Sequence, residues 1–272
     1  MTTSPVRTSP EWLALREPAD AAARAADLVA RVQRHLPAHT GVLIRDLGCG
    51  TGSMGRWLAP RLNGAQHWIG YDRDADLLAR ATAPGRAADG SPVTLETRQR
   101  DVTRLGADDL AGASLITASA LLDTLTSSEL ARLVATCTGA GCPVLITLSL
   151  IGHVELAPVD PLDQPLTEAF NAHQRRTTSH GRLLGPDAVG AAAEAFSRHG
   201  HDVLERPSTW RLGPDQTALI AEWLDGWVSA ACEQRSELGT AATAYLRRRA
   251  DEAGSARLHV TVHHRDLLAV PR

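Results

Sequence analysis

The chain contains no lysine, and all 28 of its basic residues are arginine. Together with the abundant alanine, this indicates the codon bias of a GC-rich genome. The 31 acidic residues outnumber the basic ones and give a net charge of −3. The densest basic run, Arg247-Arg248-Arg249, lies in a helical pattern that continues into acidic residues. This balance leaves no electrostatic footprint for a nucleic acid, so we expect no nucleic-acid partner.

Cysteines are few, and none of the four lies in a C-x-x-C pair or at the spacing of a metal site. We therefore expect reduced thiols, a cytoplasmic protein and no metal. The sequence also lacks an apolar run of 18 residues. Its first residues, MTTSPVRTSPEW, lack the charged start and apolar core of a signal peptide. We expect no membrane partner.

Strand-like and helix-like segments alternate from residue 41 to residue 150. Apolar runs typical of buried parallel strands occur at 41–48, 66–74, 93–102, 114–123 and 143–150. Helical patterns at 53–62, 75–84 and 126–140 separate several of them. Such alternation requires right-handed crossovers and predicts a doubly wound α/β sheet.

The flanking regions are organised differently. A helix is expected over 20–37, after a disordered lead at 1–10. Beyond 150 we expect an irregular segment with a short helix near 166–174. Next come a helix at 187–200, a strand at 201–207, helices at 215–234 and 239–253, and a last strand at 257–270. The predicted parts are a tail and capping helix (1–39), a core (40–150), a substrate-pocket insertion (151–186) and a C-terminal part of the same domain (187–272) with a helical insertion at 214–254.

The stretch VLIRDLGCGTGSMGRWLA, residues 42–59, is the most informative. Three glycines at alternate positions, Gly48, Gly50 and Gly52, follow an apolar strand. A glycine loop between a strand and a helix lets a ligand approach free backbone N–H groups closely. Residues 50–55 also spell G-x-G-x-x-G, the fingerprint of nicotinamide dinucleotide sites. Asp46, however, would repel a pyrophosphate and attract the cationic end of an amino acid.

Residues 46–52, DLGCGTG, resemble motif I of the class I S-adenosylmethionine-dependent methyltransferases, [D/E]-x-G-x-G-x-G. The resemblance covers about residues 40–150. It implies a Rossmann-like α/β fold, with a seven-stranded, mostly parallel sheet, an antiparallel last strand and helical insertions. It also implies S-adenosyl-L-methionine as the cofactor. Its methionine part would meet Asp46, Gly48, Cys49, Gly50 and Gly52.

The resemblance implies further cofactor contacts after the next strands. Asp72 would accept the ribose hydroxyls, and Arg73 would cover the adenine. Asp101 would accept the adenine amino group, and the backbone N–H of Val102 would meet a ring nitrogen. Ser119 lies where the transferred methyl group must sit. In the N-terminal helix, Arg16 is a candidate contact for the carboxylate of the cofactor.

The resemblance further implies attack of an acceptor on the sulfonium methyl group, a reaction that depends mainly on positioning and desolvation. After the fourth strand the chain reads ASALLD, without the N/D-P-P-Y/F signature of methyltransferases that act on adenine or glutamine. Asp123 at this place is a candidate base, a substrate anchor or a helix N-cap. Thr126 and Ser127 are further candidates for that cap.

The acceptor pocket is expected from the irregular residues after the fifth strand. His173 is the first candidate for a general base, because the pKa of histidine lies near neutrality. His153 is the second, and a surface or capping role is the alternative for each. The neighbouring side chains that would contact the acceptor are Phe170, Asn171, Gln174 and Arg175.

We therefore predict methyl transfer to a small molecule, with oxygen as the preferred acceptor atom, by a monomer or homodimer. Three alternatives remain at this point. They are an RNA methyltransferase, an NAD(P)-dependent oxidoreductase and a non-catalytic protein that binds S-adenosylmethionine.

Overall fold

The computed structural model describes residues 8–37 and 41–272. Its α-helices are α1 (Pro10–Ala23), α2 (Asp27–His35), α3 (Ser53–Leu58), α4 (Ala75–Leu78), α5 (Ala107–Leu110), α6 (Ser127–Gly139), α7 (Asp163–Gln174), α8 (Ala188–Arg198), α9 (Thr217–Gln234) and α10 (Gly239–Gly254). Its strands are β1 (Val42–Leu47), β2 (Gln66–Asp72), β3 (Val93–Gln99), β4 (Leu115–Ser119), β5 (Val144–Ala157), β6 (Thr177–Thr178), β7 (Gly181–Arg182), β8 (His201–Pro207), β9 (Trp210–Leu212) and β10 (His259–Pro271). Most of the predicted lead at 1–10, and the predicted boundary at 39–40, lie outside the described residues.

One large sheet organises the molecule, with the strand order β3-β2-β1-β4-β5-β10-β8. The strands from β3 to β5 are parallel neighbours, and β10 runs antiparallel to both β5 and β8. The short strand β9 also pairs with β10 and makes the sheet eight-stranded. The prediction of a seven-stranded, mostly parallel sheet with an antiparallel last strand is confirmed, with β9 as an addition.

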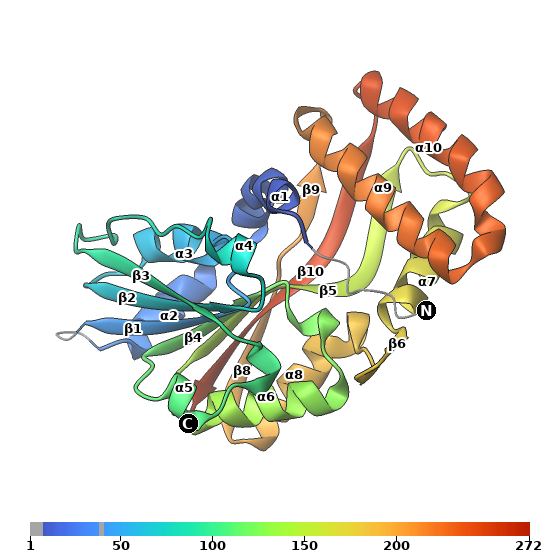
Figure 1. Ribbon diagram of the computed structural model, residues 1–272. Coiled ribbons are helices and arrows are strands. Elements are labelled where there is room, and N and C mark those ends of the chain that lie inside the picture. Colours follow the sequence, from blue (N-terminus) through green and yellow to red (C-terminus); the bar gives the residue numbers. More distant parts are fainter. Residues whose placement is uncertain (1–7, 38–40) are drawn as a thin grey trace.

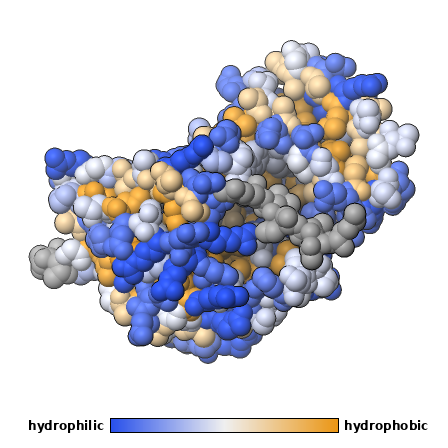
Figure 2. Space-filling model, in the orientation of Figure 1, coloured by the Kyte–Doolittle hydropathy of each residue, from blue (hydrophilic) through white to orange (hydrophobic). Residues whose placement is uncertain are grey.

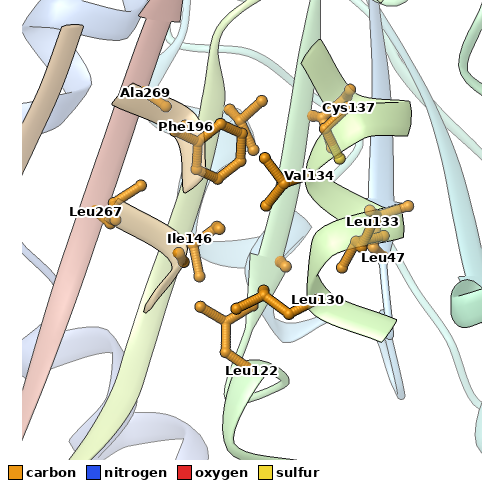
Figure 3. Packing of buried hydrophobic residues seen from close by; sticks show 14 of the residues in the cluster. Leu47, Leu122, Leu130, Leu133, Val134, Cys137, Ile146, Phe196, Leu267 and Ala269 are labelled. Atoms are coloured by element: carbon orange, nitrogen blue, oxygen red, sulfur yellow. The ribbon is translucent and has the colours of Figure 1, made fainter. Parts of the chain in front are cut away.

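Helices cover both faces of this sheet. On one face, Leu130 and Val134 of α6 and Phe196 of α8 converge on Ile146 of β5 (Figure 3), and each of these side chains is at most 3% exposed. Burial of such a side chain contributes about 1.5–3 kcal/mol. On the other face, α2 and α3 pack against the same strands. Among the described residues, no helix is long and apolar enough to cross a bilayer.

Beyond the carboxyl edge of the sheet, β5 and β10 continue as a two-stranded ribbon. Their pairing reaches out to Ala157 and His259, through two irregularities in register. The ribbon extends toward α9 and α10 (Figure 1). A third apolar cluster packs side chains of α1, α7, α9 and α10 against the outer strands. The outline of the molecule is indented between the part that holds α3 and α4 and the part that holds α9 and α10 (Figure 2).

Two predicted elements differ from the structure. The helix expected over 20–37 is two helices, because α1 starts already at Pro10 and the chain turns extended at Arg24 before α2 begins. The strand expected to end at residue 150 continues to Ala157, so the segment taken as irregular after 150 begins in regular pairing with β10. In both places, a partner more than a hundred residues away decides the local conformation.

The buried carboxylate of Asp266, on β10, holds the chain at both of these places. It is fully buried and accepts 2.8 Å hydrogen bonds from the backbone N–H groups of Ala25 and Leu148. Ala25 lies in the break between α1 and α2. Leu148 interrupts β5 with a φ of 56°, in the left-handed region that non-glycine residues rarely adopt. Asp266 therefore fixes the N-terminal helices to the middle of β5.

We expect Asp266→Ala to lower the free energy of unfolding by about 2–4 kcal/mol, because two buried N–H groups lose a charged acceptor. Denaturant titration followed by circular dichroism measures the change. Asp202→Ala is the matched control, since Asp202 is 71% exposed in its ion pair with Arg272 and its loss should cost less than about 0.5 kcal/mol. Equal losses in the two variants would contradict the anchoring role.

Candidate functional site

The glycine loop joins β1 to α3 at the carboxyl edge of the sheet. Gly48, Gly50 and Gly52 have φ values of 68°, 53° and 89°, all in the left-handed region. A Cβ on Gly52 would lie only 2.6 Å from the carbonyl oxygen of Thr82. These positions require glycine both for their backbone conformation and for the space around them. The loop is therefore a tightly packed cradle at the start of a helix.

Asp46 lies under this loop at the end of β1. It is 3% exposed and accepts a 2.7 Å hydrogen bond from the hydroxyl of Thr117, its neighbour on β4. Burial raises the pKa of Asp46 to about 7, although the hydrogen bond from Thr117 and the charge of Arg24 oppose this rise. A carboxyl group in this position changes its charge near neutrality and would favour a cationic ligand group.

Arg24, which the sequence reasoning did not select, reaches two hydroxyl groups beside this loop. Its Nη2 lies 3.2 Å from the hydroxyl of Ser119 and 3.4 Å from that of Ser53. Its Nη1 is buried and has no hydrogen-bond partner among the described residues. The guanidinium also stacks over Trp57, 5.5 Å from the ring centre. The unused donor fits an anionic ligand group, such as a carboxylate.

Arg16, the predicted contact for that carboxylate, is engaged elsewhere. It forms an ion pair with Asp20, with 2.9 Å between Nε and Oδ2, and its guanidinium lies over Trp210. Arg24 lies eight residues further along, in an alanine-rich stretch. Arg24 is a single charged residue between alanines, and this pattern could have marked it in the sequence as a candidate contact for the cofactor.

The acids after β2 and β3 lie along the same edge. Asp72 accepts 2.9 Å hydrogen bonds from the backbone N–H groups of Gly50 and Asp74, which ties the end of β2 to the glycine loop. Asp101 lies two residues past β3 and accepts hydrogen bonds from the N–H and hydroxyl of Thr103. The acids at the ends of β1 and β2 and just past β3 are thus brought to one edge of the sheet.

The remaining predicted cofactor contacts have varied surroundings. Arg73 is exposed, and Val102 is half-buried at the start of a short 3-10 turn. Cys49 is buried, with its thiol against Gly70, where a Cβ would lie 2.7 Å from the sulfur. Ser119 accepts a 3.0 Å hydrogen bond from the hydroxyl of Thr147 on β5. Ser119 thus joins Arg24 to the end of β4 and to the inner half of β5.

Asp123 lies in the 3-10 turn Leu122–Thr124, just past β4. It does not cap α6, because Thr126 is the N-cap and forms a capping box with Glu129. Burial raises the pKa of Asp123 to about 6, against the opposing charges of Arg16 and Arg176. A carboxyl with this pKa is ionised at neutral pH and accepts a proton more readily than an exposed aspartate.

The predicted acceptor residues lie on α7 and at its C-cap, Arg175, but two of them have structural partners. The side-chain amide of Asn171 donates to the carbonyl of Gly152 at 2.7 Å. Arg175 forms a two-pronged ion pair with Asp187, at 2.6 and 2.7 Å. Phe170 packs against the apolar cluster of the ribbon, and Gln174 is half-buried.

The two candidate histidines lie in different places. The Nε2 of His173 is 3.1 Å from the carboxylate of Glu233 on α9, and burial, helped by Arg176, lowers its pKa. His153 lies on the outer part of β5 with its Nε2 2.9 Å from Glu155. It is 59% exposed. His153 was selected because it is close in sequence to the fifth strand. In the structure it belongs to that strand and lies on an exposed face.

An open cavity of about 740 Å³ lies beside the C-terminal end of α7. Two positions from the predicted acceptor region, Arg175 and Arg176, line it. The other residues at this cavity are Glu168, Ala172, Thr177, Arg182 and Gln234. The lining contains three arginines and one glutamate, so the positive charges outnumber the negative one.

Comparison with known proteins identifies the central part of the chain. Residues 44–140, from β1 to the end of α6, match the family described as "Methyltransferase domain". No curated protein sequence matches the chain.

Solved structures similar to this chain include three from bacteria. The cyclopropane synthase MmaA2 from Mycobacterium tuberculosis is 13% identical, with 89% of this chain and 83% of that chain covered and a TM-score of 0.46. The YcgJ protein from Bacillus subtilis is 14% identical, with 91% and 99% covered and a TM-score of 0.48. A SAM-dependent methyltransferase from Geobacter sulfurreducens, in complex with S-adenosyl-L-homocysteine, is 16% identical, with 97% and 99% covered and a TM-score of 0.43.

Because these structural similarities are weak, the family match and the geometry of the loop decide between the cofactors considered. A buried acid under the glycine loop opposes a pyrophosphate, and the matched family is not one of nicotinamide enzymes. Residues 44–140 therefore resemble a methyltransferase domain, and the buried acid under the glycine loop favours S-adenosylmethionine over a nicotinamide dinucleotide as its cofactor.

Proposed function

We propose that this chain transfers the methyl group of S-adenosylmethionine to an oxygen atom of a small-molecule acceptor. The observation that carries the proposal is the pair of opposite charges beside the glycine loop. Asp46 offers a buried carboxyl group, and Arg24 offers a buried donor with no partner among the described side chains. The amino-acid end of the methyl donor is a zwitterion, which needs one group of each sign.

In this proposal, Arg24 holds the carboxylate of the cofactor and Asp46 holds its ammonium group. Asp72 accepts the ribose hydroxyls, while Asp101 and the N–H of Val102 meet the adenine. When bound, the cofactor supplies a methyl group already activated by its sulfonium. The chain has to place the acceptor in line with that methyl group and keep water away.

Asp123 is the base that the geometry favours, ahead of His173. It lies in the turn that follows β4, four residues after Ser119, and close enough to Arg16 and Arg176 for their charges to oppose the rise of its pKa. An acceptor hydroxyl between α1 and the end of α7 would give its proton to this carboxylate. His173, held by Glu233, and the cavity lined by Arg175 and Arg176 would bind the rest of the acceptor. That cavity favours an acceptor with an anionic group.

We expect Arg24→Met to weaken S-adenosylhomocysteine binding by about 10- to 100-fold, since a charge-assisted hydrogen bond is lost. Isothermal titration calorimetry measures the affinity, and Arg34→Met, at an exposed position of α2, should leave it unchanged. Arg24→Lys tests the same role if the methionine variant folds poorly. A well-folded Arg24 variant with full affinity would remove the proposed contact.

The affinity for S-adenosylhomocysteine should rise about tenfold from pH 6 to pH 8. The pKa of Asp46 is raised to about 7, so the carboxyl is mostly neutral at pH 6 and mostly ionised at pH 8. The cationic ammonium group prefers the ionised form. Calorimetry at both pH values measures the effect, and Asp46→Asn should abolish the difference. The same pH dependence in that variant would show that another group causes it.

A panel of phenols, carboxylic acids, hydroxylated acids and amines, each incubated with S-adenosylmethionine and analysed by mass spectrometry, tests the reaction itself. Methylation of an oxygen is the expected product. On the best acceptor, Asp123→Asn should lower kcat by about 10²–10⁴-fold. Wild-type activity should fall as the pH drops through about 6, because Asp123 becomes protonated. His173→Gln should affect mainly KM. Methylation confined to amines would overturn the oxygen assignment.

A further inference from the structure

Three side chains of types that can ligate a metal ion, His153, Glu155 and His263, lie together on the outer part of the β5–β10 ribbon. The Nε2 of His153 lies 2.9 Å, and the Nε2 of His263 lies 3.0 Å, from the same oxygen of Glu155. All three ligand atoms lie within 4.8 Å of one another. The two imidazole rings are tilted, with their centres 4.5 Å apart.

The ribbon itself brings these side chains together. His153 and Glu155 are two residues apart on β5 and therefore project from the same face of the strand. Leu150 and Val154 have the opposite parity along β5, and they pack into the apolar cluster on the other face of the strand. On β10, Val262 also packs into that cluster. The register irregularity that follows Val262 includes His263. The three ligands thus share the face that points away from α9.

We propose that His153, Glu155 and His263 bind a divalent transition-metal ion, with Zn²⁺ as the best-fitting ion. Two imidazole nitrogens and one carboxylate oxygen are a ligand set that zinc accepts, with bonds of about 2.0–2.2 Å. Two ligand atoms at these bond lengths lie about 2.8–3.1 Å apart in octahedral geometry and about 3.3–3.6 Å apart in tetrahedral geometry. The observed separations of 2.9 and 3.0 Å need only a small adjustment. Water would complete the coordination.

The exposure of the ligands permits that adjustment. His153 and Glu155 are 59% and 60% exposed, and His263 is 26% exposed. Their side chains can rotate without disturbing a packed core, and an ion can enter directly from solvent. A bound ion would join β5 to β10 at the end that carries α9 and α10. Anything that binds only the folded chain stabilises it.

The proposed site could not be recognised from the sequence, because its ligands are far apart along the chain. His263 lies 108 residues from Glu155 along the chain, so no short metal-binding motif exists. A second exposed pair on adjacent strands, His67 and Glu96, shows the difference. Its ligand atoms are 3.7 Å apart, and the other ring nitrogen of His67 lies 2.8 Å from the hydroxyl of Thr94. That pair lacks a second histidine.

The test is calorimetric titration of the full chain with ZnCl₂ after removal of metal by EDTA. We expect one ion per chain, with micromolar or tighter affinity. His153→Gln, Glu155→Gln and His263→Gln should each weaken binding about tenfold or more, since the loss of a group that only supports a metal ligand already costs about that much. His67→Gln is the matched control and should bind as the wild type does. Zn²⁺ should also raise the melting temperature of the wild type and not that of His263→Gln.

Three outcomes would overturn the proposal. One is the absence of stoichiometric Zn²⁺ binding, which would leave the three side chains as a hydrogen-bonded group only. Another is wild-type affinity in all three ligand variants. The last is an equal loss in His67→Gln, which would point to non-specific binding at surface histidines. Circular dichroism spectra of the variants show whether each one is folded.

Discussion

The buried carboxylate of Asp266 is the constraint on which the arrangement of this molecule depends. It accepts one hydrogen bond from the backbone N–H of Ala25, at the break between α1 and α2. It accepts a second from the backbone N–H of Leu148, where β5 leaves regular geometry. The residue just before Ala25 is Arg24, whose guanidinium reaches Ser53 and Ser119 beside the glycine loop. A single acid on the antiparallel strand thus determines where the cation of the proposed cofactor site lies. An uncompensated buried charge would be costly, and the two N–H groups offset that cost.

Two separate apolar environments meet at this point. The central sheet has its helical layers on both faces, and the ribbon has an apolar cluster of its own. Helix α1 belongs to the ribbon cluster through Trp12, Leu15 and Ala19, while its Glu17 forms an ion pair with Arg56 of α3. The proposed cofactor site belongs to the sheet, and most of the proposed acceptor site belongs to the ribbon. The methyl group would be transferred where α1 and the turn after β4 come together.

The positions of the glycine loop and of the acids in the candidate cofactor site could be predicted from the sequence, because their determinants are local. A glycine loop after an apolar strand, and acids after the next two strands, are brought to one edge by the rule that parallel strands end together. The break at Arg24 could not be predicted, since its cause is Asp266, more than two hundred residues away. The outer half of β5 was missed for the same reason: its regular geometry depends on pairing with β10. On α7, the residue types suggested substrate contacts, yet Asn171 and Arg175 are held by Gly152 and Asp187.

The length of β5 has a consequence for how such a protein can diversify. Its first half lies in the sheet beside the cofactor loop, and its second half supports α7 and the α9–α10 hairpin through contacts of their own. Insertions or replacements in the outer half would alter the proposed acceptor side and leave the pairing of β5 with β4, beside the proposed cofactor site, in place. Leu148, with its left-handed backbone, therefore marks the border between the part of β5 that belongs to the central sheet and the part that forms the ribbon.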